Sequence, residues 1–144
     1  RLKVEIFKKL ASALTLEDLD EVEAEIRDRF GRLPEALENL IGITRLRLLA
    51  HQAQVRSLQQ QGEQLRVRFN HPFIWPADHL ARLTRRLGKQ ARTLTLLDGG
   101  DFMIRTRALD SGELMAVLEV LLREAGDLVK GTAAGTVLVA GKSG

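Results

Sequence analysis

The sequence predicts an α+β fold, in which an N-terminal helical layer of two to three helices precedes short antiparallel strand pairs interleaved with two helices. Apolar residues recur at helical spacing through the first third of the chain and then alternate with polar residues over short segments. Glycines and prolines separate these segments at positions typical of helix ends and turns. The order of the two patterns therefore gives helices first and mixed elements afterwards.

The N-terminal layer begins with a helix predicted over residues 2–13. Its apolar residues share one face: Leu2, Ile6, Leu10 and Ala13. A second, amphipathic helix is predicted over residues 16–30, because Thr15 is a suitable N-cap and Asp18 can bond back to the cap. Gly31 is expected to end this helix in a left-handed conformation.

Pro34 is expected in the first turn of a third helix, which reaches about residue 54. The residues predicted to face inward are Leu37, Leu40, Ile41, Ile43, Thr44, Leu48 and Leu49. Residues 55–60 and 63–69 then flank Gly62, and the second of these segments alternates apolar residues with arginines as a half-buried strand does. We therefore expect a strand pair here.

The remaining elements follow from turn and cap signals. Pro76 opens a helix that reaches about Leu87 and ends at Gly88. Residues 92–98 and 101–107 flank a Gly-Gly pair, which favours a hairpin, although the order of the strands in the sheet stays open.

A last helix is expected from a capping box at Asp110 and Glu113 to about Ala125, with Gly126 as its end. Residues 127–144 have no usable period, and we predict a flexible tail after a single domain over residues 1–126.

Composition excludes several classes of protein. The 144 residues suit one compact domain. The chain contains no cysteine, which excludes disulfides and thiolate chemistry and favours the cytoplasm. No apolar run approaches the roughly 20 residues that span a bilayer. Because the chain opens at Arg1 without an initiator methionine, we expect it to be a piece of a longer protein or a processed product.

No catalytic or metal-binding set is evident. The segment "GTVLVAGKSG" resembles a phosphate-binding P-loop, but Thr136 stands where the first glycine belongs and no helix follows Ser143. The histidines, His51, His71 and His79, form no metal-binding pair. The serines lack a nucleophile motif. We therefore expect no enzyme activity and no cofactor in this chain.

Two charged segments can each be interpreted in two ways, as a binding surface or as a solvated face. The basic run contains Arg82, Arg85, Arg86, Lys89 and Arg92. It is either a phosphate contact surface or a solvated helix face, and stacking aromatics are missing nearby.

The second predicted helix has the opposite bias. The helix dipole explains acids in its first turn, but not Glu21, Glu25 and Asp28, which share one stripe away from the apolar face. Because acids at this spacing repel one another, the stripe either meets a basic partner or serves as a solubility face.

Three segments resemble the C-terminal domain of the bacterial transcription-repair coupling factor (Mfd) family. They are "RL…FKKLA" at the start, "EIRDRFGRLP" at residues 25–34 and "LIGITRLR" at residues 40–47. The pattern E-x-x-DRFG-x-LP is specific, and the match is strong over roughly the first 58 residues. Beyond these, "HPFIWPADHL" stands at a matching place.

The resemblance implies a parent that is an ATP-dependent double-stranded-DNA translocase with ATP and Mg²⁺ in motor domains outside this chain. Such a parent displaces stalled RNA polymerase and recruits the excision-repair protein UvrA. Its C-terminal domain is regulatory: it packs on an N-terminal UvrB-like module and masks the UvrA-binding surface.

The resemblance also implies a site. We expect Glu25, Asp28 and Arg29 at the interdomain interface, presented by a rigid helix corner at residues 30–34, and we add Glu21 because it lies in the same acidic stripe. The corner residues are Phe30, Gly31 and Pro34. In the structural alternative, Asp28 and Arg29 only cap the corner. The alternative function is an accessory nucleic-acid-binding domain that uses the basic run from Arg82.

Overall fold

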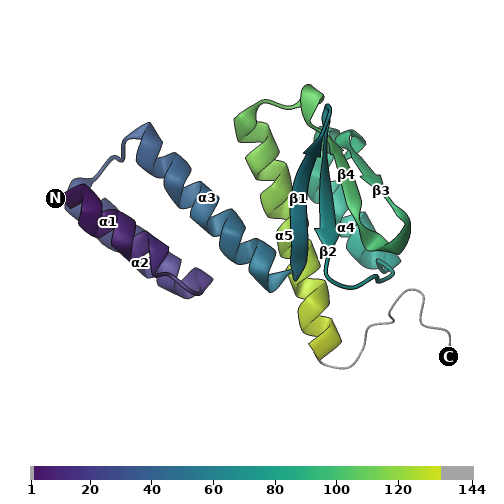
Figure 1. Cartoon of the computed structure of the whole chain (residues 1–144), viewed down its shortest axis with the longest axis horizontal. Helices are drawn as coiled ribbons and strands as arrows, with labels where there is room; N and C mark the ends of the chain where they lie inside the picture. Colours follow the sequence, from purple (N-terminus) through teal and green to yellow (C-terminus); the bar gives the residue numbers. More distant parts are fainter. Residues whose placement is uncertain (1, 134–144) are drawn as a thin grey trace. The chain divides into compact units, whose positions relative to one another are not determined.

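The computed structural model describes residues 2–133, with side chains described for residues 4–131. The chain divides into two compact units, an N-terminal unit (Arg1–Leu49) and a C-terminal unit (Ala50–Gly144). The fold has the α+β composition that the sequence predicts, with helices alone in the first unit and a sheet with helices in the second (Figure 1).

The N-terminal unit consists of α1 (Leu2–Ala11), α2 (Leu16–Phe30) and most of α3 (Glu35–Gln52). The predicted cap of α2 is confirmed: Thr15 Oγ1 accepts the Asp18 N–H at 3.0 Å. The Asp18 carboxylate bonds back at 3.0 Å, to the N–H of Leu14. These two bonds satisfy backbone donors that a helix start otherwise leaves open.

The corner between α2 and α3 differs in detail from the prediction. Gly31 has the positive φ expected, 70°, but its ψ of −119° lies outside the left-handed helical region. Its N–H donates to the Arg27 carbonyl at 2.7 Å, which closes the last turn of α2. Pro34 precedes α3 by one residue, and its carbonyl accepts the N–H groups of Leu37 and Glu38.

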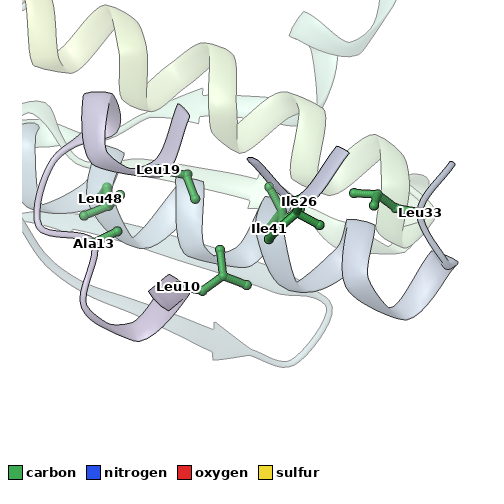
Figure 2. Close-up of a cluster of buried hydrophobic side chains, with 7 residues drawn as sticks. All are labelled: Leu10, Ala13, Leu19, Ile26, Leu33, Ile41 and Leu48. Carbon is green, nitrogen blue, oxygen red and sulfur yellow. The ribbon is translucent and has the colours of Figure 1, made fainter. Parts of the chain in front are cut away.

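The core of the N-terminal unit is formed by apolar residues of all three helices and of the loops before and after α2 (Figure 2). Its buried members are Leu10, Ala13, Leu19, Ile26, Leu33, Ile41 and Leu48. Each large aliphatic side chain buried this way contributes about 1.5–3 kcal/mol. The inward orientation predicted for Ile43 is wrong: its side chain is 58% exposed, because the buried face of α3 follows Ile41, Thr44 and Leu48.

The C-terminal unit contains one antiparallel sheet with the strand order β1-β2-β4-β3. The strands are β1 (Val55–Gln61), β2 (Gln64–Phe69), β3 (Leu94–Leu96) and β4 (Phe102–Arg105). Val67 lies opposite both Leu58 and Phe102, so these residues share the inner face of the sheet. Arg66, opposite Gln59 and Met103, lies on the outer face. Both strand pairs are confirmed, and their order is now defined.

The hairpin strands β3 and β4 are shorter than predicted. Residues Gly88–Thr93 form a 3₁₀ helix, η1, before β3, and Asp98–Gly100 form another, η2, at the turn. Gly100 has a φ of 97°, and a Cβ there would lie 2.7 Å from the Phe73 carbonyl oxygen. Its own carbonyl accepts the indole N–H of buried Trp75 at 2.9 Å. This glycine is therefore required by both its conformation and its close neighbours.

Two helices, α4 (Ala77–Leu87) and α5 (Ser111–Ala133), complete the C-terminal unit and contact each other on one side of the sheet (Figure 1). A short 3₁₀ helix, η3 (Thr106–Ala108), precedes α5. The predicted capping box is confirmed, since the N–H of Glu113 donates to Asp110 at 2.8 Å and the N–H of Asp110 donates to Glu113 at 2.9 Å.

The predicted end of the last helix at Gly126 is wrong, because α5 continues to Ala133. Gly126 is buried in the helix, and Ala125 and Leu128 on either side of it are buried as well. This burial offsets the roughly 1 kcal/mol that a glycine costs inside a helix. Residues 127–133, predicted as tail, are therefore helical. The rest of the predicted tail, with the P-loop-like segment, lies outside the described residues.

Candidate functional site

The orientation of α2 follows from its apolar residues. Leu19 and Ile26 are buried, and the opposite side of the helix exposes Glu17, Glu21 and Asp28. These three carboxylates step by four and by seven residues, which places them along one helix face. We call this set the α2 acidic face.

The α2 acidic face has no partner within the part of the chain that the structure describes. Neither the side chain of Glu21 nor that of Asp28 makes a hydrogen bond or an ion pair to a described residue, and the same is true of the Glu17 side chain. Glu17 lies in the first turn of α2, where the helix dipole favours an acid. Glu21 and Asp28 have no such structural explanation.

Glu25, also predicted at the interface, is engaged within the unit, and Arg29, the fourth predicted residue, lies beside it. The Glu25 carboxylate forms a short ion pair with Lys9 Nζ of α1, and Arg29 Nη2 lies 3.8 Å from it. The hydrogen bond from Lys9 lowers the pKa of the Glu25 carboxyl below its ordinary value, and the charges of Lys9 and Arg29 act in the same direction. Glu25 is therefore not a free carboxylate, although both side chains stay largely exposed.

Sequence analysis missed a charge network between α2 and α3. Arg45 of α3 pairs with Glu23 at 2.5 Å and with Asp20 at 3.3 Å. Arg27 joins the same network through Glu23 at 2.8 Å and Glu38 at 2.7 Å. The spacing of Glu23 and Arg27 by four residues signals one pair, but nothing local points to Arg45.

The network shifts the pKa values of its members. Burial alone raises the pKa of the Glu23 carboxyl, but the hydrogen bonds from Arg27 and Arg45 outweigh it, and the net pKa is lowered. The bonds to Glu38 and Glu23 raise the pKa of the Arg27 guanidinium. These acids are thus committed to the unit's own stability, and the α2 acidic face remains for other contacts.

The helix corner presents one apolar side chain beside these charges. Phe30 is 40% exposed at the end of α2. It lines a small pocket of about 30 Å³ between α1 and α2, together with Ile6, Ile26 and Arg29. A pocket of this size holds about one water molecule, so it serves as a shallow surface feature rather than a ligand site.

The basic run from Arg82 lies on α4 and η1 and is divided between two roles. Arg82 Nη1 and Arg86 Nη1 lie 2.7 Å and 3.5 Å from the carboxylate of Glu124, which belongs to α5 and is fully buried. His79 Nδ1 lies 2.7 Å from the same carboxylate. No local sequence pattern pointed to Glu124, which is surrounded by apolar residues of α5.

The other members of the run, Arg85, Lys89 and Arg92, are exposed and have no partner among residues 4–131. In the described region, no group of three or more His, Asp or Glu side chains is placed to hold a metal ion. None of the described helices is long and apolar enough to cross a membrane.

Comparison with known proteins identifies relatives that match part of the chain. The chain is 46% identical over 48 residues to a transcription-repair-coupling factor of Haemophilus influenzae, which covers 33% of this chain and 4% of that protein. It is 39% identical over 57 residues to the transcription-repair-coupling factor of Escherichia coli, which covers 40% of this chain and 5% of that protein. The chain thus matches only a small share of either relative.

The fold has a counterpart among solved structures. A crystal structure of the C-terminal domain of a transcription-repair coupling factor superposes with a TM-score of 0.64 at 16% identity, covering 91% of this chain and 83% of that one. At this identity the similarity establishes the fold, and it confirms the predicted α+β class. The model of the TRCF domain family matches residues 1–73, just over half of the chain. The chain therefore belongs to the TRCF domain family.

Proposed function

We propose that this chain is the regulatory, autoinhibitory C-terminal domain of a transcription-repair coupling factor. In this role it packs on the N-terminal UvrB-like module of the same protein and masks the surface that UvrA binds. The observation that carries the proposal is the α2 acidic face. The unit pairs or caps most of the acids of α2, yet leaves Glu21 and Asp28 exposed and without a partner among the residues described.

Unpaired carboxylates on a rigid helix suit a contact that must open. A common core with α1 and α3 holds α2 in place, so the acidic face needs little ordering when it docks. Each exposed ion pair with a basic partner contributes about 0–1 kcal/mol. A few such pairs give a modest, polar interface that releases readily, as interfaces between domains of one chain often do.

Because of their contacts within the unit, we assign Glu25 and Arg29 different roles in the proposed interface. Glu25 supports the interface indirectly, because its pair with Lys9 joins α1 to α2. The Arg29 guanidinium is more than half exposed and lies 3.8 Å from Glu25, beyond ordinary hydrogen-bond distance. Arg29 is therefore free to meet an acid of the docked module without breaking a strong contact.

The parent that fits this role is an ATP-dependent double-stranded-DNA translocase, which displaces stalled RNA polymerase and recruits nucleotide excision repair in the bacterial cytoplasm. In the parent, ATP and Mg²⁺ belong to the motor domains, and this chain is a non-catalytic regulator. The relatives support the proposal through their name, transcription-repair-coupling factor.

Binding of this chain to the isolated N-terminal module of the same parent tests the proposal. We expect the double variant Glu21→Gln and Asp28→Asn to bind about 5- to 30-fold more weakly by calorimetric titration, since two ion pairs of up to about 1 kcal/mol each are lost. Neither side chain has a partner to lose among the described residues, so the fold should be unchanged.

The matched control is Glu35→Gln, which removes an exposed, unpaired carboxylate from α3 of the same unit. We expect this control to bind like the unmodified chain. Equal affinity of the double variant and the unmodified chain would show that the acidic face does not dock.

A further inference from the structure

The α4 basic surface, which consists of Arg82, Arg85, Arg86, Lys89 and Arg92, is not used by the proposed function. All five residues lie within the C-terminal unit, on α4 and on η1 directly after it. Two of them are positioned by Glu124, whose side chain is 0% exposed. Its carboxylate accepts one N–H group from Arg82 at 2.7 Å and one from Arg86 at 3.5 Å.

The Glu124 carboxylate orients these arginines without occupying them. A guanidinium group has five N–H donors, and the contacts with Glu124 engage one nitrogen of each arginine. The two side chains remain 43% and 40% exposed. Their outward donors are therefore held in place and available to a second anion.

Positive charge dominates this surface. Five cations face three carboxylates, namely buried Glu124, exposed Asp78 in the first turn of α4, and Glu113, which lines a pocket with Lys89 and Arg92; this leaves an excess of two positive charges. Arg85, Lys89 and Arg92 have no hydrogen-bond or ion-pair partner within the described range. Such an excess, uncompensated by the unit itself, attracts an anionic partner.

The spacing suits an anion that repeats along a line. Arg85 and Arg86 lie three and four residues after Arg82 on α4, so the three share one side of that helix, and Lys89 and Arg92 follow on η1 after α4 ends. From Arg82 to Arg86 the helix rises roughly 6 Å. Along one strand of a nucleic-acid duplex this distance corresponds to about two phosphate steps.

The chemistry of the surface favours phosphate over protein. None of the large apolar side chains that the described part of the chain exposes lies between residues 77 and 93, whereas the centre of a protein interface is usually apolar. The segment contains no Phe, Tyr or Trp on which single-stranded bases could stack. Four of the five cations are arginines, whose planar donors match phosphate oxygens.

We propose that the α4 basic surface binds the phosphate backbone of a nucleic-acid duplex without sequence preference, and that Glu124 is the positioning residue for Arg82 and Arg86. The site lies on the C-terminal unit and is independent of docking by the α2 acidic face. The phosphates lie along α4 and η1. A nearby pocket of about 370 Å³ is a poorer place for them, because Glu113 lines it together with Lys89 and Arg92.

The test is fluorescence anisotropy of this 144-residue chain with a short DNA duplex across a salt series, with an RNA duplex of the same sequence and single strands as further arms. For four or five phosphate contacts, we expect log K to fall with log salt with a slope of about −4. The double variant Arg85→Gln and Lys89→Gln should reduce the slope by about 2. Neither residue has a structural partner to lose among those described.

The matched control is Arg56→Gln with Arg105→Gln, two exposed arginines of the same unit without a described partner. This control removes the same charge and should leave the slope unchanged. The proposal is overturned if no duplex binds at low salt, if the control lowers the slope as much, or if single strands or an acidic polypeptide such as polyglutamate bind more tightly than the duplexes. Binding of DNA alone or of both duplexes supports the phosphate contact.

Glu124→Gln tests the positioning. This change adds one positive charge to the surface, so charge alone would strengthen duplex binding. Because Arg82 and Arg86 lose their anionic anchor, we expect weaker binding instead, and tighter binding would refute the positioning by Glu124. Circular dichroism checks that the variant is folded; should it fail to fold, the Arg85 and Lys89 variant alone decides the proposal. Variants of the α2 acidic face should not change duplex binding, so the two proposals fail separately.

Discussion

The two units of this chain handle charged residues in opposite ways. The N-terminal unit pairs several of its acids at partly exposed positions, where half-buried Glu23 meets Arg27 and Arg45. The C-terminal unit buries one carboxylate, Glu124, completely and surrounds it with cations. An exposed pair contributes about 0–1 kcal/mol, whereas a buried charge requires its partners to compensate for lost hydration. Similar residue types are therefore marginal to stability in one unit and essential in the other.

The largest expected effect on stability concerns the buried carboxylate of the C-terminal unit. We expect Glu124→Ala to lower the free energy of unfolding of the C-terminal unit by about 4 kcal/mol, because it leaves the inner donors of His79 and Arg82 unpaired and creates a cavity. The matched change Glu23→Ala should cost the N-terminal unit about 1 kcal/mol or less.

Urea unfolding separates the two units. Trp75 is the only tryptophan of the chain and is buried in the C-terminal unit, so its fluorescence reports that unit alone. Helical circular dichroism reports both units. Equal losses for Glu124→Ala and Glu23→Ala would contradict the contrast between buried and exposed charge.

The next effect compares two glycines with positive φ. Gly100→Ala is expected to cost about 3 kcal/mol, because a Cβ would lie 2.7 Å from the Phe73 carbonyl oxygen in addition to the backbone strain. Gly31→Ala meets no atom within 4 Å and should cost only the strain, about 1–2 kcal/mol. Thermal unfolding of both variants measures the difference, and a larger loss at Gly31 would show that the corner is more tightly constrained than its surroundings suggest.

The smallest effect concerns pH and belongs to the N-terminal unit. The pKa of Glu23 is lowered in the folded state from its ordinary value of 4.5. A carboxyl with a lowered folded pKa stabilises the fold above its unfolded value, and this contribution is lost as pH falls through the folded value. We expect a loss of less than about 1 kcal/mol from this partly exposed group below pH 4.5.

Comparison with Glu23→Gln isolates this contribution. The variant cannot titrate at residue 23, so its unfolding free energy should change less between neutral and acidic pH than that of the unmodified chain. If the free energy of unfolding changed equally with pH in both proteins, Glu23 would not be the group responsible.

Local signals predicted the elements of this fold, and tertiary contacts decided the rest. The caps at Thr15 and Asp110 depend on residues three positions apart, so the sequence was sufficient to locate them. The end of α5 was missed because burial beside Gly126 outweighs its tendency to end a helix. The buried cluster around Glu124 joins residues 38 to 45 positions apart, which no local pattern reveals.

The candidate site shows the same division. Periodicity correctly placed Glu21, Glu25 and Asp28 away from the apolar face of α2. It treated the three acids alike, whereas Lys9, 16 residues before Glu25, neutralises Glu25 and leaves the other two unpaired among the described residues. Helical spacing gives the face of a side chain, but its partners depend on which neighbouring helix packs beside it.

The most direct test of the central claim is UvrA binding by the full-length parent that carries Glu21→Gln and Asp28→Asn. If the α2 acidic face holds the parent in its repressed form, this variant should bind UvrA more tightly and hydrolyse ATP faster at rest, while Glu35→Gln changes neither. Unchanged UvrA affinity in the double variant would contradict the account.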